Sequence, residues 1–133
     1  MTENGLVTSS SAFSVSETVS RLESALCSRG LTLFARIDHA AGAAEANMKL
    51  RPTQLLVFGN ARGGTPLMQA DQLAGIDLPL KALVWEDAQG RVYLSTNAPA
   101  WISRRHNLPS TVDAAVSAMT LALEGLVKSA TVS

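Results

Sequence analysis

Three segments decide the fold of this chain: Gln54–Asn60 (QLLVFGN), Gly63–Met68 (GGTPLM) and Leu78–Asp87 (LPLKALVWED). The first is a continuous apolar run, which is typical of a central strand with neighbours on both faces. The second predicts a helix with Thr65 as its cap and Pro66 at the first helical position, where the missing N–H costs nothing. The third predicts another strand. The chain therefore has strand, helix and strand at its centre.

Four elements are predicted before this centre: a strand over Leu6–Phe13, a helix over Val15–Arg29, a strand over Leu31–Asp38 and a short helix over Ala40–Met48. In the second of these strands, side chains alternate between two faces, as in a half-buried strand. The alternation predicts Leu31, Leu33, Ala35 and Ile37 on one side and Thr32, Phe34, Arg36 and Asp38 on the other.

The first predicted helix has clear ends and a clear buried face. Ser14-Val-Ser-Glu17 forms a capping box, and Gly30 is suited to the left-handed stop after the last turn. Apolar residues at helical spacing predict a buried stripe of Val19, Leu22, Ala25 and Leu26. Cys27, the chain's single cysteine, is predicted to be a small buried hydrophobe rather than a reactive thiol, and one cysteine allows no intrachain disulfide.

After the centre, turn residues in Asp87–Gly90 predict a hairpin whose second strand is Arg91–Thr96. Pro99–His106 predicts a short helix. The segment Ser110–Asp113 caps the last and longest helix, and the tail from Ser129 is polar and predicted to fray.

This order of elements predicts an α+β fold: a two-layer sandwich of one mixed or antiparallel sheet with helices mainly on one face. We expect a single domain over residues 1–133, with frayed ends at 1–5 and 129–133. A sheet covered on one side leaves its other face open. Phe34 and Trp85 are expected on that face, and a homodimer would bury it.

Composition excludes some classes of function. The chain has 11 Lys and Arg and 11 Asp and Glu, so it lacks the basic excess of a nucleic-acid-binding protein. Met1–Gly5 does not resemble a secretory signal, and no apolar stretch approaches the ~20 residues that span a bilayer. We therefore expect a soluble cytoplasmic protein without a membrane or nucleic-acid partner.

The glycine-rich segment Gly59–Pro66 is a candidate anion site. It follows a strand and opens a helix, so that backbone N–H groups, the positive helix end and Arg62 could face an anion. It lacks both common nucleotide-binding fingerprints. The alternative is a tight connection that needs glycines for positive φ.

The two histidines, His39 and His106, are candidates for acid–base chemistry, and Asp38 lies beside the first of them. Adjacent residues on an extended segment point to opposite sides, so these two are not automatically partners. Two histidines and one cysteine without close spacing are a weak metal-ligand set, and no metal is expected. For Arg104-Arg105-His106, the simpler interpretation is cation placement at a helix C-terminus.

Lys81 shares one strand face with Leu83, Trp85 and Asp87. A lysine among apolar side chains can be desolvated, and a desolvated lysine can act as a base or nucleophile. The alternative is a lysine at a sheet edge or in an ion pair.

Several segments resemble the domain-of-unknown-function 302 family across nearly the whole chain. The resemblance is carried by the helix that ends at Gly30, by Ile37-Asp38-His39, by Leu55–Asn60, by Gly64–Met68 together with Leu78–Asp87, and by Arg105-His106. It implies a small, dimeric α+β domain and supplies no catalytic residues or cofactor. If the shared polar positions form a ligand site, its residues are Asp38, His39, Asn60, Thr65, Lys81 and His106.

Three functions remain open at this point. The first is a homodimer that binds a small molecule or anion near the Gly59–Pro66 loop, and this is the one that the pattern favours because no nucleophile–base–acid set is visible. The second is an enzyme with Lys81 or His39 as base or nucleophile. The third is a structural or interaction module without a ligand.

Overall fold

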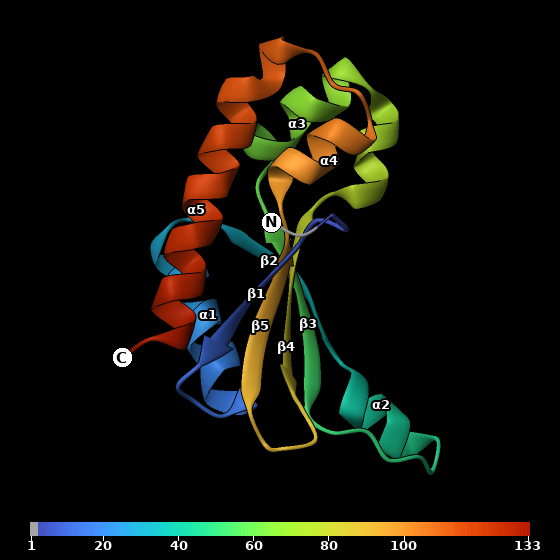
Figure 1. The fold of residues 1–133 in the computed structure, drawn as a ribbon, viewed down its shortest axis with the longest axis vertical. Coiled ribbons are helices and arrows are strands. Elements are labelled where there is room, and N and C mark those ends of the chain that lie inside the picture. Colours follow the sequence, from blue (N-terminus) through green and yellow to red (C-terminus); the bar gives the residue numbers. More distant parts are fainter. Residues whose placement is uncertain (1–2) are drawn as a thin grey trace.

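A computed structural model describes residues 3–133 (Figure 1). Its centre is one five-stranded sheet in which every neighbouring pair is antiparallel, in the order β1-β5-β4-β3-β2. The strands are β1 (Leu6–Ser11), β2 (Thr32–Asp38), β3 (Thr53–Gly59), β4 (Leu80–Glu86) and β5 (Val92–Asn97). The predicted α+β class is confirmed, and of the two sheet types considered the observed one is antiparallel rather than mixed.

Within the described residues, five α-helices and two short 3₁₀ helices accompany the sheet. They are α1 (Val15–Ser28), α2 (His39–Glu45), α3 (Ala61–Ala70), η1 (Gln72–Asp77), α4 (Pro99–Arg105), η2 (Ser110–Val112) and α5 (Asp113–Thr131). Helices α1 and α5 cover one face of the sheet, while α3, η1 and α4 gather beyond one end of it, and α2 projects at the other end (Figure 1). The order of α-helices and strands agrees with the prediction.

The core lies between the sheet and α1 with α5, and a second apolar cluster joins α3, η1 and α4 to the first half of α5. In α1 the predicted stripe is buried, with Leu22 and Leu26 each 1 % exposed. The Ser14 hydroxyl accepts a hydrogen bond from the Glu17 N–H at 3.1 Å, as its capping role requires. The prediction for Cys27 was wrong: it lies beyond the edge of the stripe and is exposed.

Side chains of the central strands alternate between the helix-covered face and an open face. Residues directly opposite each other in an antiparallel pair share a face. Val57 therefore lies with Lys81, and Leu55 with Leu83, on the side away from buried Leu56 and Phe58. We call this side the open sheet face; Trp85 and Tyr93 continue it, with ring centroids 4.9 Å apart.

The predicted alternation in β2 was wrong because a bulge interrupts it. Leu33 lies opposite Phe58 but Ala35 lies opposite Val57, so Phe34 is an extra residue between them. Leu33 and Ala35 thus face opposite sides of the sheet. The bulge also displaces Phe34 from the predicted open face to the mouth of a cavity described below.

Two described parts of the predicted frayed ends, Gly5 and residues 129–131, make contacts with the rest of the fold. Residues 129–131 continue α5, Ala130 and Thr131 are buried, and the Thr131 carbonyl accepts the Ala12 N–H at 2.9 Å. At the other end, Gly5 is buried under the Trp101 ring, and its carbonyl accepts the Ala98 N–H at 2.8 Å. Of the predicted frayed start, residues 1 and 2 lie outside the described part.

By length and composition, one helical stretch among residues 3–133 could cross a membrane: Ser110–Thr131, with a mean hydropathy of 1.3. On this measure, the expectation that no apolar stretch approaches bilayer length was wrong. In the fold, Val116, Leu123 and Leu126 of this stretch are buried in the two apolar clusters, and 28 % of its apolar window is buried.

Candidate functional site

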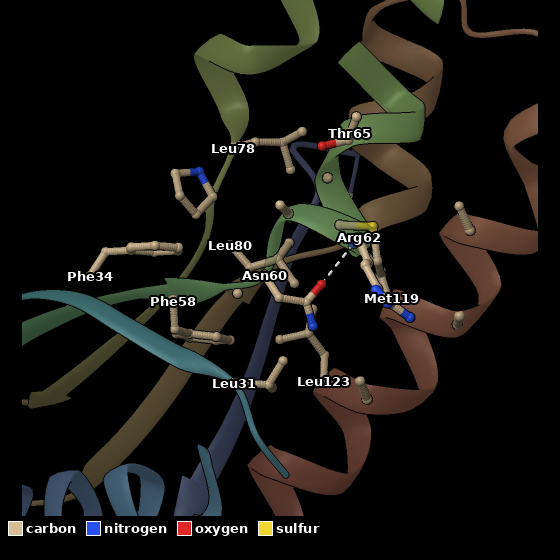
Figure 2. A pocket seen from close by; sticks show the side chains of 18 of the residues that line it. Leu31, Phe34, Phe58, Asn60, Arg62, Thr65, Leu78, Leu80, Met119 and Leu123 are labelled. Atoms are coloured by element: carbon tan, nitrogen blue, oxygen red, sulfur yellow. Dashed lines mark hydrogen bonds between the residues drawn. The ribbon is translucent and has the colours of Figure 1, made fainter. Parts of the chain in front are cut away.

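A cavity of about 520 Å³ lies between α3, α5 and the adjoining ends of β2, β3 and β4 (Figure 2). We call it the α3–α5 cavity. Its wall is mainly apolar and includes Leu31, Phe34, Phe58, Met68, Leu78, Leu80, Met119, Leu123 and Leu126. Polar side chains enter the lining at Asn60, Arg62 and Thr65, which follow one another along the start of α3. One rim is therefore polar and the remaining wall is apolar.

The polar rim is built by the turn from β3 into α3. Gly59 has a φ of 151°, which a residue with a side chain rarely adopts, and the next residue caps the helix. The Asn60 Oδ1 accepts the Gly63 N–H at 2.8 Å, and the Asn60 carbonyl accepts the Gly64 N–H at 3.4 Å. The helix thus begins at Ala61 under an asparagine cap.

The prediction for the start of this helix was therefore wrong, and of the two interpretations of the glycines the open anion cradle is not the one observed. Thr65 is not the cap and Pro66 is not the first helical residue, because both lie inside α3. Gly63 and Gly64 do not form an open anion cradle, because Asn60 already accepts their N–H groups. The two glycines instead form a wall without side chains, and a Cβ built on Gly64 would lie 3.6 Å from Leu78 Cδ1.

Arg62 supplies the charge of the rim. Its side chain is exposed and lies beside Met119 in Figure 2. Among residues 3–133, no carboxylate forms an ion pair with Arg62, and no acidic residue lines the cavity. The cavity therefore has one positive charge at its edge that no acid of the described chain balances.

The six predicted site residues do not converge on one cleft. Asn60 and Thr65 line the α3–α5 cavity. Asp38 caps α2, its Oδ1 accepting the Ala41 N–H at 2.9 Å, and His39 is the exposed first residue of that helix, at the end of the sheet far from α3 (Figure 1). Lys81 lies on the open sheet face opposite Val57, and it does not line the cavity.

His106, the sixth residue, belongs to a partly buried polar cluster. Its Nε2 lies 2.6 Å from Asp77 Oδ2, and Arg105 Nη1 lies 2.8 Å from Asp77 Oδ1. The Arg105 guanidinium also lies 5.6 Å from the Trp101 ring. The cluster joins the end of η1 to the end of α4, so Arg105 and His106 do more than complement a helix dipole. Sequence reasoning missed Asp77, because 28 residues separate it from Arg105.

These positions give little support to the catalytic hypotheses. Among residues 3–133, neither the Lys81 nor the His39 side chain makes a hydrogen bond or ion pair, so neither has the orienting partner that a base or nucleophile uses. Within the same residues, no three His, Cys, Asp or Glu side chains come close enough to hold a metal ion.

Most of the apolar wall was also absent from the sequence-based prediction. Phe34 reaches the cavity through the β2 bulge, and Met119 and Leu123 reach it from α5. One sequence pattern could have indicated the cavity: Ala115, Ala118 and Ala122 repeat at helical spacing on α5, beside its buried stripe. Small residues on one face of a helix leave room against the neighbouring element, and here that room is the cavity.

Comparisons with known proteins place the chain in a family. A crystal structure of an uncharacterized conserved DUF302 protein from Bacillus stearothermophilus matches 95 % of this chain and 98 % of its own, with a TM-score of 0.83 and 17 % identity. Proteins named fluoride-specific ion channel FluC 1 from Brucella suis and FluC 2 from Brucella melitensis are 48 % identical over 117 residues. That match covers 88 % of this chain but only 46 % and 43 % of those proteins, so the chain spans less than half of their length. The model of the domain of unknown function DUF302 matches residues 7–126, and the chain belongs to that family.

Proposed function

We propose that this domain binds a small organic molecule in the α3–α5 cavity. The observation that carries the proposal is a largely apolar cavity of about 520 Å³ with a few polar groups at one rim. Ligand sites in proteins commonly have volumes of ~300–1,000 Å³ and this distribution of polar and apolar lining.

The hydrophobic effect supplies the affinity in this proposal. Burial of ~200 Å² of apolar ligand surface would contribute about 5 kcal/mol before the costs of association. Phe58 and Leu123 belong to the fixed core, so the wall is formed before the ligand arrives. Preformed walls reduce the ordering cost of binding.

Filling the cavity with a side chain tests the proposal. In Ala122→Trp the indole would occupy the cavity, whereas Leu121→Trp adds the same group at the preceding position of α5, which is 69 % exposed and outside the cavity. We expect the fluorescent apolar probe anilinonaphthalene sulfonate to bind the wild type and Leu121→Trp, and to bind Ala122→Trp much more weakly. Equal binding to all three proteins would argue against the cavity as the site.

We also propose that the domain is a homodimer through the open sheet face. Leu83 lies near the centre of this face, between Leu55 on β3 and Ser95 on β5, and it is only half-buried. A second copy would remove these side chains from water. Sedimentation should give a dimer for the wild type and a monomer for Leu83→Glu, with Leu121→Glu as the control. A monomeric wild type would contradict the proposal.

The names of the Brucella relatives suggest a second role, as a domain that accompanies a fluoride channel. The 48 % identity favours it. Because this chain matches less than half of each relative, we assign fluoride conduction to the remainder of those proteins and ligand binding to this domain. Liposomes reconstituted with this chain alone should then release fluoride no faster than protein-free liposomes. Faster release would assign channel activity to this chain.

A further inference from the structure

We propose that the ligand of the α3–α5 cavity is an elongated apolar monocarboxylate, with its hydrocarbon part against α5 and its carboxylate at Arg62. This inference rests on the proposed function, since it names the chemical class that the cavity would take. It starts from the distribution of charge. The polar and cationic groups lie at one rim, and the opposite wall is apolar.

The apolar part of the ligand follows from the wall. Phe34 and Phe58 lie on the sheet side, and Met119 and Leu123 face them from α5 (Figure 2). These side chains can contact methylene groups or an aromatic ring, but they offer no strong hydrogen-bond donor or acceptor to a polar substituent. A sugar or nucleotide would leave many polar atoms unpaired in this wall, at a high cost in free energy. The wall therefore selects a hydrocarbon.

The charge of the ligand follows from the rim. Among residues 3–133, Arg62 is the only charged residue that lines the cavity. Among residues 3–133 no carboxylate pairs with it, so a ligand anion would not need to displace one. A guanidinium matches the planar geometry of a carboxylate and can donate two parallel hydrogen bonds to it.

The neighbours of Arg62 support an anion at the same place. Arg62 lies in the first turn of α3, a ten-residue helix, so the positive end of that helix dipole adds to its charge. The amide of Asn60 and the hydroxyl of Thr65 can each donate a further hydrogen bond. One cation and two neutral groups suit a monoanion, whereas a phosphate monoester carries about −1.5 to −2 charges and would be only partly balanced.

The test compares ligands that differ only in their charge. Calorimetry would measure binding of decanoate and of decanol, both below the concentrations at which they aggregate, to the wild type, Arg62→Gln and Arg91→Gln. Arg91 precedes β5 in the hairpin turn and does not line the cavity, so its variant controls for a lost surface charge. We expect decanoate to bind Arg62→Gln roughly tenfold more weakly than the wild type, as for a lost charged hydrogen bond, and decanol to bind both equally.

Each result separates this inference from the proposed function. If decanoate and decanol both bind the wild type and neither is weakened in Arg62→Gln, the cavity binds hydrocarbon without selecting an anion, and only the carboxylate inference falls. If Arg91→Gln weakens decanoate as much as Arg62→Gln does, the effect is one of net charge, and the inference also falls. If neither compound binds the wild type while the apolar fluorescent probe does, only the carboxylate inference falls. If Ala122→Trp leaves both affinities unchanged, the cavity is not the site and both proposals fall.

Discussion

The polar cluster of Asp77, Arg105 and His106 predicts that the substitution Asp77→Asn lowers the free energy of unfolding. This change keeps the shape of the side chain and removes the charge that faces His106 and Arg105. The side chains of Asp77 and His106 are only 12 % and 10 % exposed, so water can do little to replace the lost interaction. An amide in this place would also turn one of its two acceptors into a donor.

The magnitude follows from the two contacts. A buried hydrogen bond to a charged group contributes about 1.5–3 kcal/mol, which applies to the 2.6 Å contact with His106. The Arg105 side chain is 50 % exposed, so its pair is discounted to about 0.2–1 kcal/mol. The expected loss of unfolding free energy is therefore about 2–4 kcal/mol, or a decrease in Tm of roughly 10 °C for a chain of this size.

The assay is urea and thermal unfolding followed by circular dichroism. Glu124→Gln removes an exposed carboxylate from α5 and should change the unfolding free energy by less than about 0.5 kcal/mol. A double-mutant cycle with His106→Ala would separate the contribution of the histidine from that of the arginine. If Asp77→Asn unfolds within about 0.5 kcal/mol of the wild type, the cluster does not hold η1 to α4 as we infer.

Two further substitutions test the fold. Gly5→Ala should destabilise the protein by about 1–3 kcal/mol more than Gly90→Ala. Both glycines have a φ near 80°, but only at Gly5 would a new Cβ collide with the Trp101 ring. Equal losses of unfolding free energy in urea would contradict this prediction. Leu56→Ala should cost about 2–5 kcal/mol in the same assay, because Leu56 is fully buried between the sheet and its helices; a cost below about 1 kcal/mol would show that the core tolerates the missing volume.

The fold was largely predictable because local patterns and tertiary packing agree. The apolar run in β3, the turn residues before β5 and the capping serine of α1 each determine an element by local physics. The start of α3 was not predictable in this way. Two glycines and Pro66 favour a loop, and the helix forms because the Asn60 cap and the packing of Leu67 outweigh them.

The site was less predictable than the fold, because tertiary structure assembles it. Of the six candidate ligand residues, Asn60 and Thr65 line the α3–α5 cavity, and both come from the one turn that leads from β3 into α3. The β2 bulge that moves Phe34 leaves no mark in a stretch that alternates cleanly. The pairing of Asp77 with His106 depends on the position of η1 against α4, which no local pattern records.

Native mass spectrometry tests the central claim, ligand binding in the α3–α5 cavity, most directly. The wild type, Ala122→Trp and Leu121→Trp would be purified gently from the protein's own cells and weighed under native and denaturing conditions. We predict that the wild type and Leu121→Trp carry the additional mass of a small organic molecule that denaturation removes, and that Ala122→Trp lacks it. An identical native and denatured mass per chain in all three proteins, or the same additional mass in all three, would contradict the claim.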